Sequence, residues 1–207
     1  YRTQELIEYQ NSSFAKQYID FVGNIYEKEK KTRSSSDLTQ NVAKYLFKLM
    51  ATKDEYEVAR LSLKAELDTA ISQEFGKSAK INYMLHPPFL KAMENIPVLN
   101  MLPGVKSKLA LGSWFKVFYV MLKNMKFLRG TPLDFMAWFS SDVRKADNKA
   151  LNHYKSILTD NLDEIGNGKY QDLKEFSVLP DIIRGYEEVR LETMTEYYKK
   201  SDNLFKS

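Results

Sequence analysis

The sequence of 207 residues contains no cysteine and only two histidines, His86 and His153. Without cysteine, the chain cannot supply a disulfide, a thiol nucleophile, a thiolate zinc site or a cysteine-bound iron–sulfur cluster. His86 precedes two prolines and is weak evidence for a lone general base, and we expect His153 on the surface of a helix. Phosphate loops, dinucleotide-binding glycine motifs and the HExxH motif are also absent. We therefore predict no catalytic, cofactor-binding or metal-binding residue in this chain.

Long apolar runs are lacking as well. No run approaches the roughly 18 uninterrupted apolar residues that a membrane-spanning helix needs, and no signal peptide is present. The first residue is Tyr1, in a pattern typical of a helix start. We expect a segment of a longer polypeptide, located in the cytoplasm and without a membrane partner.

Acidic residues are missing between Asn95 and Leu133, a stretch that carries six bases. In contrast, Asp160 to Glu196 holds ten acids and four bases. The whole chain has a net charge of only +4, too mild to demand a nucleic-acid partner. The two stretches could neutralise each other, or the basic one could dock on an acidic partner. The candidate partner-docking residues are Lys116, Lys123 and Lys126.

Apolar residues recur mostly at helical spacing, and they make up 43% of the chain. This pattern predicts a mainly α-helical fold of about six helices, packed as an irregular bundle in a single domain over residues 1–207. A minor short strand element is expected near 79–86, followed by an irregular excursion to Gly112. The clearest helix signals cover Thr52 to Gly76, Ser113 to Leu128, Ser141 to Leu162, Tyr170 to Val178, and a final helix with Pro180 in its first turn.

The densest charged motif runs from Lys53 to Arg60. Paired carboxylates such as Asp54 and Glu57 could serve acid–base chemistry if they lined a cleft. The alternative is structural, with acids in a first helical turn and an ion pair between Glu57 and Arg60. We favour the structural interpretation.

Two arginines precede glycine, Arg129 before Gly130 and Arg184 before Gly185. A guanidinium at such a position can bind a carboxylate or a phosphate in a forked geometry. A structural fork onto backbone carbonyls or onto Asp134 is favoured over a ligand clamp. The candidate interdomain or structural polar contacts are therefore Asp54, Glu57, Arg60, Arg129, Asp134 and Arg184.

The helix expected from Ser113 to Leu128 is the most apolar one. Lys116, Tyr119, Lys123 and Lys126 fall on one stripe, and large apolar residues occupy most of the remaining surface. Such a helix could lie on an acidic membrane, but its apolar arc is too wide for that role. We predict a core helix with a basic solvent-exposed edge.

Five segments, taken in order, resemble a known family: Tyr45 to Ala51 with Lys53 to Leu61, Leu85-His86-Pro87-Pro88, Leu128 to Asp134, Leu179-Pro180, and Ile183 to Tyr186. Together they resemble the carboxy-terminal region of the fused indolepyruvate ferredoxin oxidoreductases, members of the 2-oxoacid:ferredoxin oxidoreductase family. The resemblance spans nearly the whole chain. His86 stands where the family has a small residue, which argues against a shared catalytic role for it.

The resemblance implies a parent enzyme that oxidatively decarboxylates an aryl pyruvate with thiamine diphosphate, Mg²⁺ and iron–sulfur clusters. Such an enzyme passes electrons to ferredoxin and releases an acyl-coenzyme A. The chain would be its accessory carboxy-terminal domain, non-catalytic by itself, serving interdomain or dimer packing in a homo-oligomer. Its expected partners are the upstream catalytic domains, with ferredoxin as a further candidate.

Two alternatives belong to other classes of protein. The first is a free-standing helical binding module for an acidic protein or a nucleic acid. The second is a small enzyme built on the Asp54 and Glu57 carboxylates, which would require a deep pocket around them.

Overall fold

The computed structural model describes residues 1–76, 82–85, 109–134, 136–137 and 141–205. Within these residues it contains nine α-helices, four short 3-10 helices and one two-stranded sheet. The predicted mainly helical class is confirmed, while the number of helices exceeds the expected six. The chain divides into two compact units, which are described separately: unit 1 comprises Tyr1–Thr52 and Asp142–Ser207, and unit 2 comprises Lys53–Ser141.

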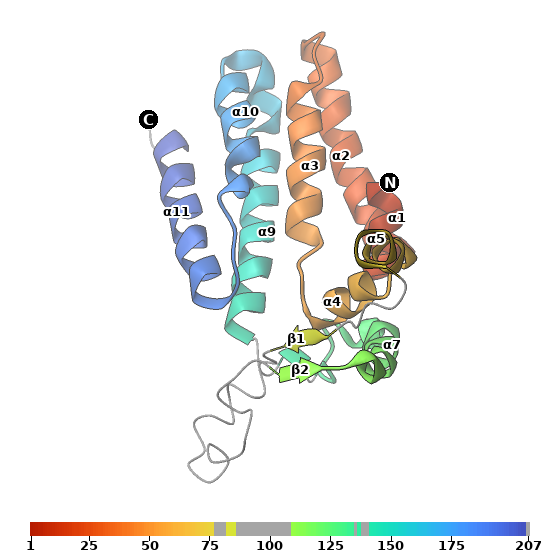
Figure 1. Cartoon of the computed structure of the whole chain (residues 1–207). Coiled ribbons are helices and arrows are strands. Elements are labelled where there is room, and N and C mark those ends of the chain that lie inside the picture. The colour runs from red at the N-terminus through yellow and green to blue at the C-terminus, as the bar shows by residue number, and fades with distance from the viewer. Residues whose placement is uncertain (77–81, 86–108, 135, 138–140, 206–207) are drawn as a thin grey trace. The chain divides into compact units, whose positions relative to one another are not determined.

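Unit 1 is a bundle of six helices. In Figure 1 its long helices lie side by side, and α3 packs against both α2 and α10. The helices are α1 (Arg2–Tyr9), α2 (Ser12–Thr32), α3 (Asp37–Met50), α9 (Ser141–Asn161), α10 (Tyr170–Val178) and α11 (Glu187–Phe205), with the 3-10 turns η4 (Leu162–Asn167) and η5 (Leu179–Asp181).

Large aromatic side chains fill the centre of this bundle. Tyr154 of α9, Phe176 of α10 and Tyr197 of α11 are fully buried. The rings of Tyr154 and Phe176 stack with their centroids 5.4 Å apart, and the Tyr154 hydroxyl donates a hydrogen bond to the Ser177 carbonyl at 2.8 Å. Burying a side chain of this size stabilises the fold by about 1.5–3 kcal/mol.

The helices α2 and α3 of unit 1 differ in how their first turns are capped. Asn11 accepts a hydrogen bond from the backbone N–H of Phe14 at 2.9 Å, which starts α2 and separates it from α1. Ser36 occupies the N-cap position of α3, but its side chain accepts no hydrogen bond from the backbone N–H groups of the helix; the Ser36 hydroxyl instead accepts one from the Gln40 side chain at 2.9 Å. The capping position of α3 is therefore Ser36, directly before Asp37.

The last helix begins later than predicted. Pro180 lies in the turn η5, and α11 starts only at Glu187. Between them Gly185 has a φ of +78°, and a Cβ at that position would lie 2.6 Å from Cγ1 of Val189. Glycine is thus required there by both conformation and space. In contrast, the predictions of α9 and α10 are confirmed to within one residue.

Unit 2 is smaller and contains short elements. They are α4 (Glu55–Ser62), α5 (Ala65–Phe75), β1 (Tyr83–Leu85), β2 (Leu109–Leu111), η2 (Ser113–Phe115), α7 (Lys116–Asn124) and η3 (Met125–Leu128). The helix expected from Thr52 to Gly76 is broken between α4 and α5, although Gly76, with a φ of +82°, does end it. β1 lies within the range expected for a strand and pairs with β2 in an antiparallel register, with Tyr83 opposite Leu111.

The described core of unit 2 joins α4 to α7. Its buried side chains are Tyr56, Ala59, Phe115, Tyr119, Leu122 and Met136. Tyr119 therefore faces the core, which corrects its expected place on the exposed lysine stripe. In the described part of the chain, no helix combines the length and apolar character that crossing a bilayer requires.

Candidate functional site: a polar network in unit 2

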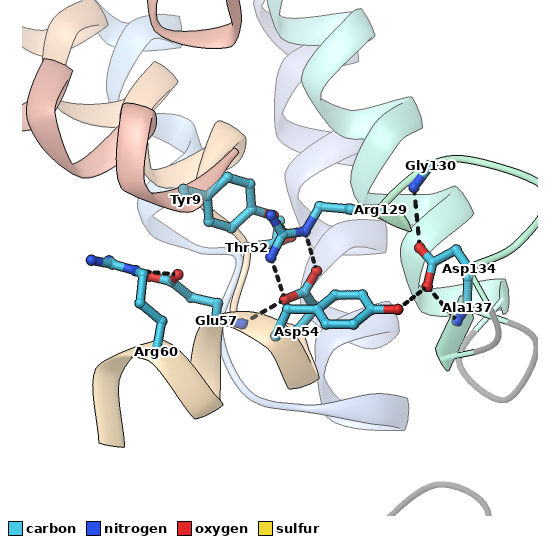
Figure 2. A network of polar contacts seen from close by, with 10 residues as sticks. Tyr9, Thr52, Asp54, Glu57, Arg60, Arg129, Gly130, Asp134 and Ala137 are labelled. Carbon is cyan, nitrogen blue, oxygen red and sulfur yellow. Dashed lines mark hydrogen bonds and ion pairs between the residues drawn. The ribbon is translucent and has the colours of Figure 1, made fainter. Parts of the chain in front are cut away.

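Asp54 anchors the polar network at the start of α4. Its backbone is extended, and its Oδ1 accepts a hydrogen bond from the N–H of Glu57 at 2.9 Å, as expected for an N-cap. Its carboxylate also receives the forked guanidinium of Arg129, with Nε 2.5 Å from Oδ2 and Nη2 2.8 Å from Oδ1 (Figure 2). The two side chains are only 7% and 12% exposed, so water screens this ion pair weakly.

Asp134 forms the second part of the network, and it is 1% exposed. Its Oδ1 accepts hydrogen bonds from the Tyr56 hydroxyl at 2.8 Å and from the Ala137 N–H at 3.2 Å. Its Oδ2 accepts one from the Gly130 N–H at 3.1 Å. Figure 2 shows that these bonds tie α4 to the segment after η3.

The two parts of the network meet at Tyr56. The guanidinium of Arg129 lies 5.5 Å from the centre of the Tyr56 ring, in cation–π geometry. Arg129 was expected to bind Asp134 or backbone carbonyls, but its carboxylate partner is Asp54. Asp134 instead binds the backbone next to Arg129, at Gly130.

The predicted ion pair between Glu57 and Arg60 is confirmed. The guanidinium donates from Nε to Oε2 at 2.9 Å and from Nη2 to Oε1 at 2.8 Å. Both side chains are at most 7% exposed. Both oxygens of Glu57 are held by a permanent cation, as are both oxygens of Asp54. This arrangement favours the structural interpretation of the pair over acid–base chemistry.

Arg184 belongs to unit 1 and forms a separate, local contact. Its Nε donates to the Asp181 carbonyl at 3.0 Å, and its Nη2 lies 3.3 Å from the Asp181 carboxylate. The side chain is 71% exposed. The expected structural fork is confirmed, and an exposed pair of this kind contributes little to stability.

The three candidate docking lysines have different surroundings. The Nζ of Lys116 lies 2.9 Å from Asp68, so α5 neutralises part of its charge. Lys123 is exposed on α7, and Lys126 lies half-buried on η3. The basic edge of α7 is therefore weaker than the sequence implied.

The surface around α7 is unusually apolar for an exposed helix. Trp114 is 66% exposed and Val117 is 76% exposed. Val120, Met121 and Phe127 are also exposed. Only the stripe of Phe115, Tyr119 and Leu122 is buried, so much of the apolar surface predicted for the core faces outward. Large contiguous patches of exposed apolar side chains are common at interaction surfaces.

Sequence reasoning missed Glu29, a carboxylate of unit 1 with 0% exposure. It accepts hydrogen bonds from the backbone N–H groups of Leu38 and Thr39, from the Thr39 hydroxyl at 2.6 Å, and from the Tyr170 hydroxyl at 2.8 Å. It thereby satisfies the first N–H groups of α3 and fastens α2 to α10. Its position four residues after the buried Ile25 was the signal that could have revealed it.

The structure describes the position of only one of the two histidines. His86 lies outside the described residues. His153 is half-buried, contrary to the expected surface position, and its Nδ1 lies 3.0 Å from the Tyr197 hydroxyl. Burial lowers the pKa of His153 below its usual value; Asp202 opposes this effect and Lys149 adds to it.

The cofactors of the family that the sequence resembles would need metal or cluster ligands. The chain has no cysteine to bind an iron–sulfur cluster. Over the described residues, no group of three or more histidine, aspartate or glutamate side chains could hold a metal ion.

Comparison with known proteins identifies a family. The model of DUF6537, described as a family of unknown function, matches residues 1–203 and so covers both units. The comparisons with the curated proteins and with the solved structures found no match.

Proposed function

The chain belongs to the DUF6537 family, and we propose that it is an accessory carboxy-terminal domain of a thiamine-dependent 2-oxoacid ferredoxin oxidoreductase of the indolepyruvate type. In this role it carries out no chemistry by itself. It packs against the upstream catalytic domains of the same polypeptide and contributes to their dimer. Thiamine diphosphate, Mg²⁺ and the iron–sulfur clusters belong to those domains, and the enzyme is cytoplasmic.

Two lines of reasoning support this proposal. The first is the ordered resemblance from Tyr45 to Tyr186. The second concerns the carboxylates that might have served catalysis, because Asp54, Glu57 and Asp134 all lie in buried ion pairs or hydrogen bonds within unit 2. Residues held in this way stabilise a scaffold rather than exchange protons with a substrate.

The observation that carries the packing role is the exposed apolar surface of α7 and its flanking turns. Trp114 and Phe127 are 66% and 67% exposed, and Val117 is 76% exposed. Large aromatic side chains dominate the binding energy of protein interfaces. We infer that this surface contacts the catalytic domains.

The first test is the intact mass of the endogenous protein. We expect a mass far above the 24.1 kDa of this chain, together with bound iron and thiamine diphosphate. A mass near 24.1 kDa would overturn the proposal and favour the free-standing binding module.

The packing surface is tested in the full-length enzyme with Trp114→Ala. Tyr186→Ala is the matched control, because Tyr186 lies in unit 1 and is also 66% exposed. Trp114→Ala should accelerate proteolytic cleavage upstream of Tyr1 several-fold and leave kcat/KM at low temperature unchanged. Equal cleavage rates for both variants would exclude the α7 surface as the contact.

A further inference from the structure

The solvent-facing side of α9 in unit 1 carries a shallow, open depression of about 620 Å³, which we call the α9 groove. It does not belong to the network of unit 2, and the proposed packing role does not use it. Its lining comes from three turns of one helix: Lys145, Asn148, Lys149, Asn152, His153 and Ser156.

Two cations of the groove lack an acidic partner. Lys145 and Lys149 are exposed one helical turn apart, and neither forms an ion pair with any residue that the structure describes. By contrast, Lys48 and Lys174 of the same unit each pair with an aspartate. The Lys149 ammonium lies 5.4 Å from the centre of the Tyr198 ring, which positions it beside the groove.

His153 adds a neutral hydrogen-bond donor. Tyr197 is fully buried, and Nδ1 of His153 is its only hydrogen-bond partner among the described residues. A buried hydroxyl that accepted a bond from Nδ1 would leave its own proton unsatisfied, so the hydroxyl donates. The imidazole therefore carries its proton on Nε2. The Asp202 carboxylate acts on the pKa of His153 in the opposite direction to Lys149, so it offsets part of the positive charge beside the groove.

The two asparagines provide a different kind of recognition. Asn148 and Asn152 are exposed one turn apart, and their carboxamides have no hydrogen-bond partner within the described residues. Each carboxamide offers donors and an acceptor. This combination matches the N–H and C=O of a peptide backbone, whereas a phosphate or a carboxylate offers acceptors only.

We propose that this α9 groove binds an extended acidic segment of a partner protein. The carboxylates of the segment bind Lys145 and Lys149, and its backbone pairs with Asn148 and Asn152. Residues four apart on a helix are separated by about 6 Å along its axis. Alternate side chains of an extended chain are separated by about 6.6–6.8 Å. The groove therefore fits acids at every second position, and this inference does not depend on the proposed function.

The test uses the whole chain and two labelled peptides of identical composition. In the first peptide two glutamates stand two positions apart, and in the second they are adjacent. Binding is measured by fluorescence polarisation at low ionic strength, because the screening length is only about 10 Å at 0.1 M salt. We expect the first peptide to bind several-fold more tightly and to shift the side-chain amide resonances of Asn148 and Asn152.

Two variants separate specific recognition from general attraction. Lys145→Glu with Lys149→Glu should weaken binding of the first peptide about tenfold. The control, Lys31→Glu with Lys199→Glu, makes the same change in net charge at exposed sites outside the groove and should alter affinity by less than twofold. Asn148→Ala with Asn152→Ala leaves the charge unchanged and should weaken binding several-fold. Circular dichroism verifies that each variant is folded.

Three results would overturn the inference. The first is an equal loss of affinity in the Lys145/Lys149 and Lys31/Lys199 variants, which would show attraction by net charge alone. The second is equal binding of the two peptides, which would remove the argument from spacing. The third is tighter binding of a single-stranded oligonucleotide of equal charge, which would identify a nucleic acid as the better occupant.

Discussion

The two units bury carboxylates in different ways. Unit 1 surrounds Glu29 with neutral donors, two from the start of α3 and two from hydroxyl groups. Unit 2 instead places an arginine opposite each of Asp54 and Glu57. Backbone N–H groups at a helix start are already aligned, whereas an arginine must lose side-chain freedom and hydration to form its pair.

The two units also differ in their apolar cores. Unit 1 buries a continuous cluster that includes Leu46, Tyr154 and Phe176. The described part of unit 2 buries a smaller cluster and leaves Trp114 and Val117 exposed. Unit 2 thus depends more on its ion pairs, and its exposed apolar side chains suit further burial against another surface.

The largest effect is expected from Arg129→Met. Removing the guanidinium leaves the Asp54 carboxylate buried without its cation, which costs about 3–5 kcal/mol of unfolding free energy. Urea denaturation followed by tryptophan fluorescence measures this loss, because both tryptophans of the chain belong to unit 2. Adding Asp54→Asn keeps the helix cap and removes the buried charge, so the double variant should recover part of the loss. A loss below about 1 kcal/mol in Arg129→Met would show that the pair is screened like a surface pair.

The next largest effect is expected at Glu29, the buried carboxylate that unit 1 stabilises with neutral donors. Glu29→Gln keeps the size but turns one acceptor into an amide donor that faces other donors, with an expected cost of about 1–3 kcal/mol. Glu27→Gln is the control, since Glu27 is exposed on the same helix and its change should stay within about 0.5 kcal/mol. Hydrogen exchange of the first N–H groups of α3 reports the effect. Equal exchange in both variants would contradict the capping role.

The difference between the two carboxylate sites also explains what the sequence could predict. The Glu57–Arg60 pair was predictable because it depends only on three-residue spacing within one helix. The Asp54–Arg129 pair joins residues 75 positions apart, so it depends on how α4 and η3 pack. Glu29 was missed because it lies in a run of charged residues. In such a run, the spacing of apolar residues does not show which charged side chain is buried.

Helix boundaries show the same limit. The confirmed helices α9 and α10 have continuous apolar periodicity and end near glycine or proline. The break between α4 and α5 at Leu63 and Lys64 has no proline or glycine to mark it. The bonds that end α4 are backbone bonds from Leu63 and Lys64 to Arg60 and Leu61, and residue type does not encode them. The exposed side of α7 was predicted as core because periodicity identifies apolar surface but not its partner.

A third prediction concerns His153 and the acid sensitivity of unit 1. Burial lowers the pKa of His153 below the usual 6.5, so the unfolded chain takes up a proton first as the pH falls. This contribution to stability is therefore complete above about pH 6.5 and decreases as the pH falls toward the folded-state pKa. His153→Gln should flatten this part of the pH profile of unfolding. An unchanged slope in the variant would assign the acid sensitivity to other groups.

Tyr197→Phe tests the hydrogen bond to His153 directly. The loss of one buried hydrogen bond should cost about 1 kcal/mol. The pKa of His153 should rise, because the neutral imidazole loses the donor that stabilises it. NMR titration of the ring nitrogens measures both the tautomer and the pKa. A protonated Nδ1 in the unaltered chain would contradict the assigned direction of this bond.

The smallest effect is expected at the exposed pair of Lys16 and Asp20, which lies on the same helix as Glu29. Their side chains are 72% and 58% exposed, so water already solvates both charges. Lys16→Met should change the unfolding free energy by about 0.5 kcal/mol or less, and 0.5 M salt should remove most of that difference. The same salt should leave the cost of Arg129→Met nearly unchanged. If salt reduced the loss of unfolding free energy equally in Lys16→Met and Arg129→Met, burial would not distinguish the two ion pairs. The contrast between a weakly screened network in unit 2 and a solvated helix surface in unit 1 would then fail.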